Sequence, residues 1–506
     1  VIDQTKCIGC HACTLACKSE NVVPVGVPRT YVKHVDVGVF PQARRAHQVT
    51  RCNQCAHAPC VVACPTAAMF KRADGIVDFD KSICIGCKAC MAACPYDAIF
   101  INPEDHSAEK CNFCAHRIDI GLEPACVVVC PVEAILVGDM NDAGSKVSRT
   151  VNRDAVDVRR PEKETLPKVF YKGAHQATLD PLAARRPDGG LFMWSEQPAS
   201  AGIINSGHPE HNNTSAAALL SYDVGHSVPW DWRVSLYTWT KSIATGVYIV
   251  SVLLWIYADV FGRLTGTADA RINSFSPLWL WATPIISGAF LAITGGLLVW
   301  DLEHPERFYM IFTRPQWRSW LVRGAFIIAG YSLVLALHFF AALTGARSIP
   351  LLLIIPGLPL AALTAVYTAY LFAQAKARDL WQNPLLPPHL LVQAVVAGSA
   401  ALLPFAAWRE DAAVAPLAWT LSVSSVLHLL MVWGEATLTH PTAHAHLAAR
   451  ELTRRRYAAF FWLGLALTLL GAFAPLIDIA AVPLALAGLL LYEHAYVQAG
   501  QSVPLA

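Results

Sequence analysis

The sixteen cysteines of the chain form four groups of four, and all of them lie between Cys7 and Cys130. The first and third groups have the C-x2-C-x2-C-x3-C spacing that is typical of iron–sulfur cluster motifs. The second group widens one gap to four residues, the fourth widens one gap to eleven, and a proline follows each of the last three groups. The pattern predicts iron–sulfur chemistry. In chain order the groups are Cys7, Cys10, Cys13, Cys17; Cys52, Cys55, Cys60, Cys64; Cys84, Cys87, Cys90, Cys94; and Cys111, Cys114, Cys126, Cys130.

Disulfide bonds and structural zinc are the alternatives for these cysteines, because C-x2-C pairs also bind zinc. Neither alternative explains four repeats of a four-cysteine motif with a trailing proline in three of them. Three closely spaced thiolates can bind three irons of a cubane cluster while the fourth points toward a neighbouring cluster, so the groups must work in pairs. Because no leading cysteine is replaced, we expect four [4Fe–4S] clusters and no three-iron cluster.

Short elements must position these thiols. Residues 75–79 and 98–101 read as strands, and they fit a small two-stranded ferredoxin module that is present twice. Small residues beside the motifs, such as Gly9 and Gly86, suit a close approach of the backbone to a cluster, with amides free to bond its sulfurs. We therefore expect residues 1–140 to form an α+β double ferredoxin-like domain that binds four clusters.

Residues 141–234 carry neither a cysteine motif nor an apolar span, and much of the segment is rich in Pro, Gly and Asn. A stretch of this length is usually functional or disordered. Its aromatic residues Phe170, Tyr171, Phe192 and Trp194 favour an extended connector that packs along the iron–sulfur domain or a partner subunit.

The remaining residues, 235–506, read as membrane. Each apolar span is near the ~20 residues needed to cross a bilayer. An even number of spans returns the C-terminus to the side of the iron–sulfur domain, and we expect an all-α domain of eight transmembrane helices. Their expected bounds are 235–260, 277–300, 320–344, 350–375, 388–408, 414–437, 457–475 and 479–498. The net charge of +2 favours no class of partner, and no block of basic residues with interleaved aromatics suggests nucleic acid, so we expect no nucleic-acid partner.

Polar residues are unevenly placed along these spans. Most lie toward the iron–sulfur domain, whereas the far leaflet holds little beyond His338. Charges within spans are expensive and usually functional, so this distribution predicts one polar pocket beneath the iron–sulfur domain for a lipid-soluble redox carrier. The residues on that side are Lys241, Asp301, Glu303, His304, Arg307, Arg323, Tyr370, Gln374, His389, Glu435, His440, Glu493 and His494.

These residues have simpler explanations that stay open. Asp301, Glu303 and Arg307 also fit interfacial loop charges, and His338 and His428 also fit histidines that pack between helices. Lys241 and Glu435 lie several residues inside apolar helices and are harder to explain in that way. No histidine pair has the spacing expected of transmembrane haem ligands, which argues against a cytochrome b.

Residues 1–140 resemble the four-cluster ferredoxin subunits of complex iron–sulfur molybdoenzymes, namely the small subunits of polysulfide, dimethyl sulfoxide and tetrathionate reductases and their NrfC relatives. Residues 230–506 resemble the NrfD and polysulfide reductase family of membrane anchors. The segments that carry the second resemblance are 301–308 (DLEHPERF), 318–320 (RSW), 367–370 (YTAY), 374–378 (QAKAR), Trp381 and 499–501 (AGQ). In those families the two parts are usually separate polypeptides, whereas here they are fused.

The resemblance to four-cluster subunits implies that the first group pairs with the fourth and the second with the third. The expected ligand sets are Cys7, Cys10, Cys13 with Cys130; Cys111, Cys114, Cys126 with Cys17; Cys52, Cys55, Cys60 with Cys94; and Cys84, Cys87, Cys90 with Cys64. It also implies a menaquinone or ubiquinone at the iron–sulfur face of the anchor, and a partner catalytic subunit that carries a molybdenum or tungsten bis-pterin cofactor.

The chain itself has no P-loop, no dinucleotide-binding motif and no nucleophile elbow, so substrate catalysis is expected on that partner. Our hypothesis for the quinone site is that Asp301, His304 and Tyr370 hydrogen-bond the quinone carbonyls, while Lys241 and Glu435 carry protons to or from them. A partly buried carboxylate or imidazole suits proton exchange because burial can move its pKa toward neutral.

Loop charges predict the orientation in a bacterial cytoplasmic membrane. Nine Lys and Arg lie on the iron–sulfur side and four on the other, so the positive-inside rule places the iron–sulfur domain in the cytoplasm. No twin-arginine signal precedes Cys7, which agrees with that side. The two sets are Arg307, Arg314, Arg318, Lys376, Arg378, Arg450, Arg454, Arg455 and Arg456 against Arg263, Arg271, Arg347 and Arg409.

The side of the membrane bears on the substrate. A catalytic subunit on the cytoplasmic side favours sulfite oxidation. A catalytic subunit on the outer side favours reduction of polysulfide, thiosulfate or tetrathionate. Two other functions stay open. The same electron path could serve a multihaem cytochrome, hydrogenase or formate dehydrogenase, or the membrane domain could translocate ions.

Overall fold

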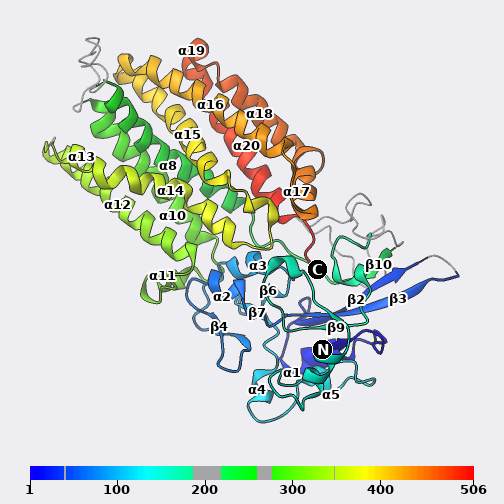
Figure 1. Cartoon of the computed structure of the whole chain (residues 1–506). Helices are drawn as coiled ribbons and strands as arrows, with labels where there is room; N and C mark the ends of the chain where they lie inside the picture. Colours follow the sequence, from blue (N-terminus) through cyan, green and yellow to red (C-terminus); the bar gives the residue numbers. More distant parts are fainter. Residues whose placement is uncertain (39–40, 186–217, 259–275, 347) are drawn as a thin grey trace.

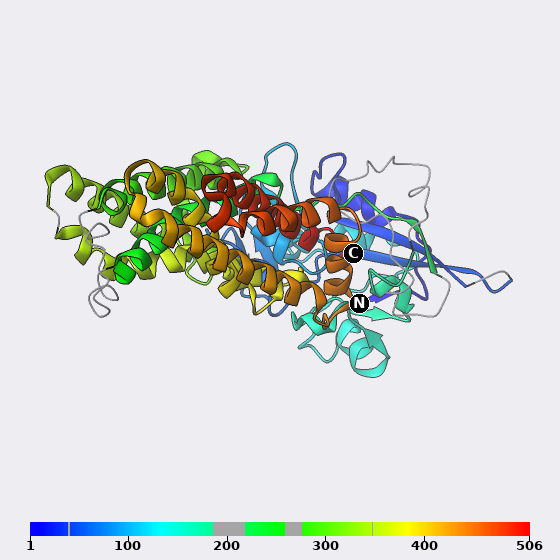
Figure 2. The same cartoon turned by 90° about the horizontal axis from the view of Figure 1, so that it is seen from above.

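The computed structural model describes residues 1–38, 41–185, 218–258, 276–346 and 348–506. A domain rich in loops and short strands lies at one end of a long helical bundle, and the two views in Figures 1 and 2 agree on this arrangement. Several residues considered above lie outside the described ranges. They are Phe192, Trp194, the last two residues of the first expected span, Arg263, Arg271 and Arg347.

Two small antiparallel hairpins lie within the cysteine-rich region. In the first, β4 (Met69–Lys71) pairs with β5 (Val77–Phe79), and in the second, β6 (Ile99–Ile101) pairs with β7 (Ala108–Lys110). β5 and β6 fall within the segments expected to be strands. Each hairpin follows a short helix and a Cys-Pro pair. The short helices of the domain are α1 (Ala12–Glu20), α2 (Pro59–Ala63), α3 (Ala89–Ala93), α4 (Ala115–Ile118) and α5 (Ala125–Val128).

Strands from residues 141–234 complete two sheets of the N-terminal domain. β10 (Ala218–Tyr222) pairs with β2 (Thr30–Val37), which pairs in turn with β3 (Arg44–Arg51). β9 (Tyr171–Lys172) lies between β1 (Ile2–Asp3) and β8 (Val156–Asp157). The other elements here are α6 (Lys146–Arg153), η1 (Pro161–Lys163) and α7 (Gln176–Leu179). The described part of the connector therefore packs on the cysteine-rich region.

The C-terminal half is helical, and seven of its described helices are long and apolar enough to cross a membrane. They are α8 (Trp232–Ile256), η4 and α10 (Leu278–Ala282 and Thr283–Trp300), α12 (Trp320–Thr344), α14 (Ile354–Gln374), α15 (Leu386–Arg409), η7 with α16 (Asp411–Ala413 and Val414–Thr437), and α19 to α20 (Ala474–Ile477 to Ala481–Gln501). Shorter helices are α11 (Met310–Thr313), α13 (Ile349–Leu352), η6 (Asp379–Gln382) and α17 (Ala443–Thr453).

The expected span 457–475 corresponds to α18 (Ala458–Gly471), which has only 14 residues. Pro475, near the start of α19, has no amide hydrogen to donate to the carbonyl four residues earlier, at Gly471, which is where α18 ends. In Figure 1, α17 lies near the iron–sulfur domain and α19 at the opposite end of the bundle, so α18 joins the two ends. Eight membrane crossings remain a prediction, because α18 is shorter than the ~20 residues of an ordinary span.

The centre of the bundle is a close crossing of α8 and α15. A Cβ atom added at Gly246 would overlap the main-chain oxygen of Ala394, and one added at Gly398 would overlap the main-chain carbon of Gly246. Small residues allow helix backbones to approach in this way within membranes. α8 is also the most deeply buried of the seven spans, so its polar residues face other helices.

Candidate functional site

Cysteines from distant groups meet around four cavities. The volumes of these cavities are about 330, 270, 320 and 370 Å³ for sites I to IV. Site I is lined by Cys7, Cys10, Cys13 and Cys130; site II by Cys17, Cys111, Cys114 and Cys126; site III by Cys52, Cys55, Cys60 and Cys94; and site IV by Cys64, Cys84, Cys87 and Cys90. These are the sets that the resemblance implied, and cluster binding by each set stays a prediction.

Short helices explain why the groups work in pairs. Helix α2 carries Cys60 to site III, and Cys64, directly after the helix, lines site IV. Helix α3 does the reverse, because Cys90 lines site IV and Cys94 lines site III. Residues four apart on a helix rise by about 6 Å, so each helix joins two neighbouring sites.

The other pair of sites is built in the same way. Helix α1 carries Cys13 to site I and Cys17 to site II, while Cys126 on α5 lines site II and Cys130 lines site I. The amide of Gln54, which lies in the second motif, donates to the main-chain carbonyl of Cys111 at 2.9 Å and so joins site III to site II. The four sites therefore follow one another in the order I, II, III, IV.

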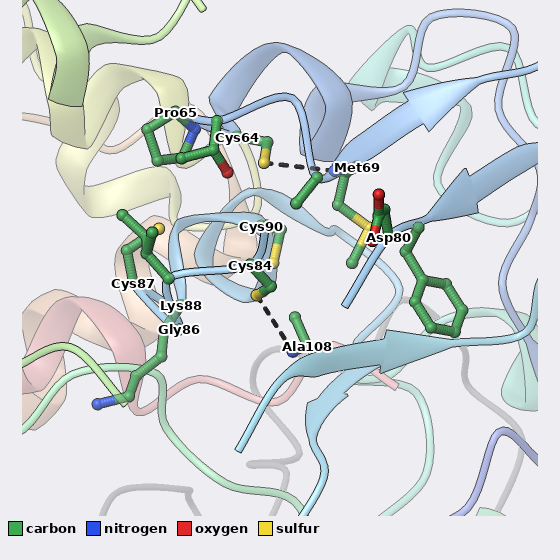
Figure 3. A pocket seen from close by; sticks show the side chains of 14 residues that line it. Cys64, Pro65, Met69, Asp80, Cys84, Gly86, Cys87, Lys88, Cys90 and Ala108 are labelled. Atoms are coloured by element: carbon green, nitrogen blue, oxygen red, sulfur yellow. Dashed lines mark hydrogen bonds between the residues drawn. The ribbon is translucent and has the colours of Figure 1, made fainter. Parts of the chain in front are cut away.

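The chemistry of the donor sets fits iron–sulfur clusters. All sixteen cysteines are free thiols. Burial, together with the neighbouring Cys52, raises the pKa of Cys55 to about 12, so four thiolates at such a site require cationic metal. Amides also point at sulfurs: that of Met69 lies 3.3 Å from Cys64 Sγ and that of Ala108 lies 3.5 Å from Cys84 Sγ, as the dashed lines in Figure 3 show. Such hydrogen bonds are typical of cluster sites.

Site IV contacts the membrane domain. Lys88 lies between Cys87 and Cys90, and its side chain points away from the thiols in Figure 3. The Lys88 ammonium donates to the main-chain carbonyl of Asp301 at 3.0 Å and lies 2.9 Å from a carboxylate oxygen of Glu303. Gly86 has a φ of +69°, and a Cβ atom there would overlap the Glu303 side chain, so this contact requires glycine.

Further hydrogen bonds hold the two domains together around the same site. The Arg307 guanidinium donates to the carbonyl of Cys84 at 3.0 Å, and the Trp230 indole donates to that of Cys87 at 3.3 Å. On the other side of the site, the hydroxyl of Ser319 donates to the carbonyl of Ala63 at 2.8 Å. The backbone around the site IV thiols is therefore fixed by residues of the membrane domain.

Two of the five predicted quinone-site residues lie at this domain contact. Asp301 is 8 % exposed, and burial raises its pKa to about 6, although Lys88 and Arg233 oppose that shift. His304 is engaged with the iron–sulfur domain, because its Nε2 atom lies 2.8 Å from the carbonyl oxygen of Asp105. In this geometry His304 joins the domains.

The other three predicted residues lie in separate places. Tyr370 is 38 % exposed and stacks on Trp320, with ring centroids 4.4 Å apart. Lys241 is fully buried on α8, where it donates to Thr368 Oγ1 at 2.6 Å and to the carbonyl of Ala365 at 2.9 Å on α14. The five residues therefore do not form a single cluster.

Glu435 is the centre of a second buried polar group, which joins α15, α16 and α20. One carboxylate oxygen lies 3.0 Å from the Asn383 amide and 3.1 Å from His389 Nδ1, and the other accepts from the Tyr492 hydroxyl at 3.0 Å. His389 Nε2 lies 2.9 Å from His428 Nδ1. His428 Nε2 is buried and has no hydrogen-bond partner in the described part of the chain.

Sequence reasoning missed Tyr237 as a site residue. It is 3 % exposed, and its hydroxyl has no hydrogen-bond partner among the described residues, as is also true of one carboxylate oxygen of Asp301. Tyr237 precedes Lys241 by four residues, so the two share a face of α8. That helical spacing was the available signal. Glu493, noted only as polar, accepts from Thr238 and Ser242 of α8 at 2.8 and 3.4 Å.

The free thiols and the apolar helices together define an iron–sulfur electron-transfer subunit with a multi-pass membrane domain. The family model described as polysulphide reductase, NrfD matches residues 222–489, and a 4Fe-4S dicluster domain matches residues 46–140. The chain belongs to the polysulphide reductase NrfD family, here fused to a dicluster-type iron–sulfur domain.

Each of three curated relatives matches less than half of this chain. A tetrathionate reductase subunit of Salmonella typhimurium is 43 % identical over 204 residues, which are 39 % of this chain and 79 % of the relative. A putative dimethyl sulfoxide reductase iron-sulfur subunit of Halobacterium salinarum is 37 % identical over 259 residues, 45 % of this chain and 95 % of the relative. The arsenate respiratory reductase iron-sulfur subunit ArrB of a Shewanella species is 36 % identical over 219 residues, 34 % of this chain and 94 % of the relative. The chain is thus similar to iron–sulfur subunits of reductase complexes.

Proposed function

We propose that this chain transfers electrons between a quinone at the iron–sulfur face of its membrane domain and a partner subunit that carries a molybdenum or tungsten bis-pterin cofactor. When bound at sites I to IV, four [4Fe–4S] clusters would supply one-electron transfer along the 1–140 domain. The observation that carries the proposal is the contact of Lys88, in the third cysteine motif, with Asp301 in the loop after α10.

The proposed quinone site lies between Asp301 and Lys241. Asp301 is next to site IV through Lys88, and Tyr237 and Lys241 continue inward along one face of α8. The hydroxyl of Tyr237 makes no hydrogen bond among the described residues, and one carboxylate oxygen of Asp301 has only ion pairs, at 3.6 Å with Lys88 and 3.7 Å with Arg233. These are the groups to which a quinone carbonyl or quinol hydroxyl would hydrogen-bond, since buried polar groups are normally hydrogen-bonded. His304 and Tyr370 would lie at the edge of this site, where we propose that they hydrogen-bond the quinone.

Quinone chemistry also needs proton exchange. We propose that Lys241 and Glu435 serve it, each with its own partners. Glu435 contacts His389, which contacts His428, and this row of groups can hold and pass a proton between neighbouring hydrogen-bonded atoms. The row leads from the iron–sulfur side of the bundle into its buried interior, where His428 is fully buried.

The relatives support a terminal reaction in the respiration of sulfur compounds, because tetrathionate and dimethyl sulfoxide appear in their names. Sulfite, polysulfide and thiosulfate belong to the same chemical range. The loop charges support a cytoplasmic iron–sulfur domain in a bacterial inner membrane. A multihaem cytochrome, a hydrogenase and a formate dehydrogenase are the alternatives to a pterin-containing catalytic partner.

Elemental analysis of the intact complex tests the proposal. The complex would be purified in mild detergent, and iron, molybdenum, tungsten and haem would be measured together with mass spectrometry of its subunits. About 16 irons per chain, molybdenum or tungsten, and a large pterin-containing subunit are expected. Haem in the absence of molybdenum and tungsten would indicate that the catalytic partner is a cytochrome and would contradict the proposal.

Ion translocation is the second candidate function, and one cavity favours it. A cavity of about 250 Å³ near the far end of the bundle is lined by Ser251, Trp255, Ser276 and Glu410, among others. Glu410 is 7 % exposed, and one of its carboxylate oxygens has no partner within the described ranges. In proteoliposomes, quinone-coupled turnover should then acidify or alkalise the lumen, and Glu410→Gln should abolish that change while electron transfer continues.

A further inference from the structure

A buried arginine lies between sites I and II. Arg51 is the last residue of β3 and is 4 % exposed. Its Nη1 atom lies 3.2 Å from Cys126 Sγ, and the side chain lines site II. Its Nε and Nη2 atoms have no hydrogen-bond partner among the residues that the structure describes. A guanidinium with two free donors is thus held against the sulfur ligands of one site.

No carboxylate in the described ranges forms an ion pair with Arg51, which distinguishes it from its neighbour. Arg29 lines the same cavity, but its guanidinium lies 2.9 Å from the carboxylate of Glu109. An unpaired buried cation is costly unless negative charge compensates it. Burial by itself would lower the pKa of Arg51, but Cys126, Cys111 and Cys13 outweigh burial and raise it above its usual value.

Two buried lysines beside the other cysteine motifs have partners. Lys88 at site IV is paired with Glu303 and Asp301. Lys110, which precedes the fourth motif, donates to the main-chain carbonyls of Val77 and Cys111. Among these residues, only Arg51 combines burial, contact with a ligand sulfur and free donors.

Cluster potentials depend on net charge, on hydrogen bonds to sulfur and on exposure. Reduction adds one electron, and hence one negative charge, to a site, and a nearby fixed cation stabilises that charge. From this geometry we propose that Arg51 raises the reduction potential of the cluster at site II, so that an electron moving along the four sites rests there. The inference depends on the proposed cluster at site II.

The first test is a redox titration of the purified complex, monitored by electron paramagnetic resonance. The site II signal would be assigned by its loss in Cys114→Ser. In Arg51→Gln all four clusters should be retained, and the site II reduction equilibrium should shift at least tenfold toward the oxidised form, which is about 59 mV for one electron. Arg51→Lys, which keeps the charge, should recover most of that shift.

Arg45→Gln is the matched control, because Arg45 lies on the same strand but is 53 % exposed and pairs with Asp36. It should leave the site II potential unchanged. An unchanged potential in Arg51→Gln with the cluster present would overturn the inference. Loss of the site II cluster in both Arg51 variants would assign the residue to cluster retention and would also overturn it. Iron content distinguishes these outcomes from a failure of the proposed function, because a wild-type protein without four clusters contradicts the function itself.

Discussion

The ammonium of Lys88 donates to the main-chain carbonyl of Asp301 at 3.0 Å, so the third cysteine motif is bonded to the loop after α10 in the membrane domain. The two residues are 213 positions apart in the chain. The same ammonium is 2.9 Å from Glu303. One side chain therefore connects the thiols of site IV to the segment that is proposed to contact the quinone.

Replacing Lys88 by methionine should loosen this contact. The variant keeps the length of the side chain but loses hydrogen bonds that involve a charge, each worth about 1.5–3 kcal/mol. We expect a lower unfolding temperature and faster hydrogen exchange in residues 85–88 and 301–304. Lys172→Met, at an exposed ion pair with Asp154, is the control and should change neither quantity. Unaltered exchange at both segments would argue against a structural role for the contact.

Replacing Glu435 by glutamine should impair quinone-coupled turnover. Glutamine can still accept from Tyr492, but it cannot take up a proton from His389. A general acid or base contributes typically about 10²–10⁴-fold, so we expect a loss of at least about 100-fold with a quinol donor. Direct reduction of the iron–sulfur domain by dithionite should be unaffected. Glu104→Gln, at an exposed loop of the iron–sulfur domain, should behave as wild type. A Glu435→Gln rate equal to that of wild type would remove this residue from the proton path.

Adding a methyl group at Gly246 should destabilise the membrane domain. The new Cβ would overlap the backbone of α15, which cannot move as a flexible side chain can. Overpacking of this kind costs about 1–3 kcal/mol or more. Gly296→Ala on α10 is the matched control, because nothing lies within 4 Å of its added Cβ. Thermal unfolding in detergent should separate the two variants, and equal midpoints would contradict the tight crossing of α8 and α15.

Stability should depend on pH through His226. Burial would lower the pKa of this histidine, but Asp223 and Asp97 outweigh burial and raise it to about 9. A pKa above the unfolded value means that the stabilisation is complete below about pH 6.5 and is lost as pH rises through about 9. The expected loss is on the order of 2–4 kcal/mol. Unfolding measured between pH 6 and 10 should show it in wild type and in His57→Gln, which alters an exposed histidine, but should not show it in His226→Gln.

Local spacing explains which features could be predicted. The cysteine motifs are read directly from the chain. At α2 and α3, thiols that are four residues apart line sites III and IV, which are the two sites expected to form a pair. Hydropathy located the long helices, but it could not show that Pro475 limits the length of α18. It also could not indicate that β10, after the connector, pairs with β2 near the N-terminus.

The candidate quinone site was less predictable, because its members are brought together by tertiary contacts. His304 was expected at a quinone carbonyl, but its ring lies against Asp105 of the other domain. Glu435 was chosen for its depth in an apolar helix, while its partner His389 lies 46 residues earlier on α15. Only Tyr237 could have been found by helical periodicity alone, since it lies one turn before Lys241.

The alternation of thiols along α2 and α3 has a consequence for assembly. Each of these five-residue helices carries a ligand to one site and is followed by a ligand to the next. A nascent chain that has acquired metal at site III has therefore also positioned Cys64 and Cys90 for site IV. Clusters should then be inserted in pairs. Partially loaded preparations should be mixtures of chains with zero, two or four cubane clusters.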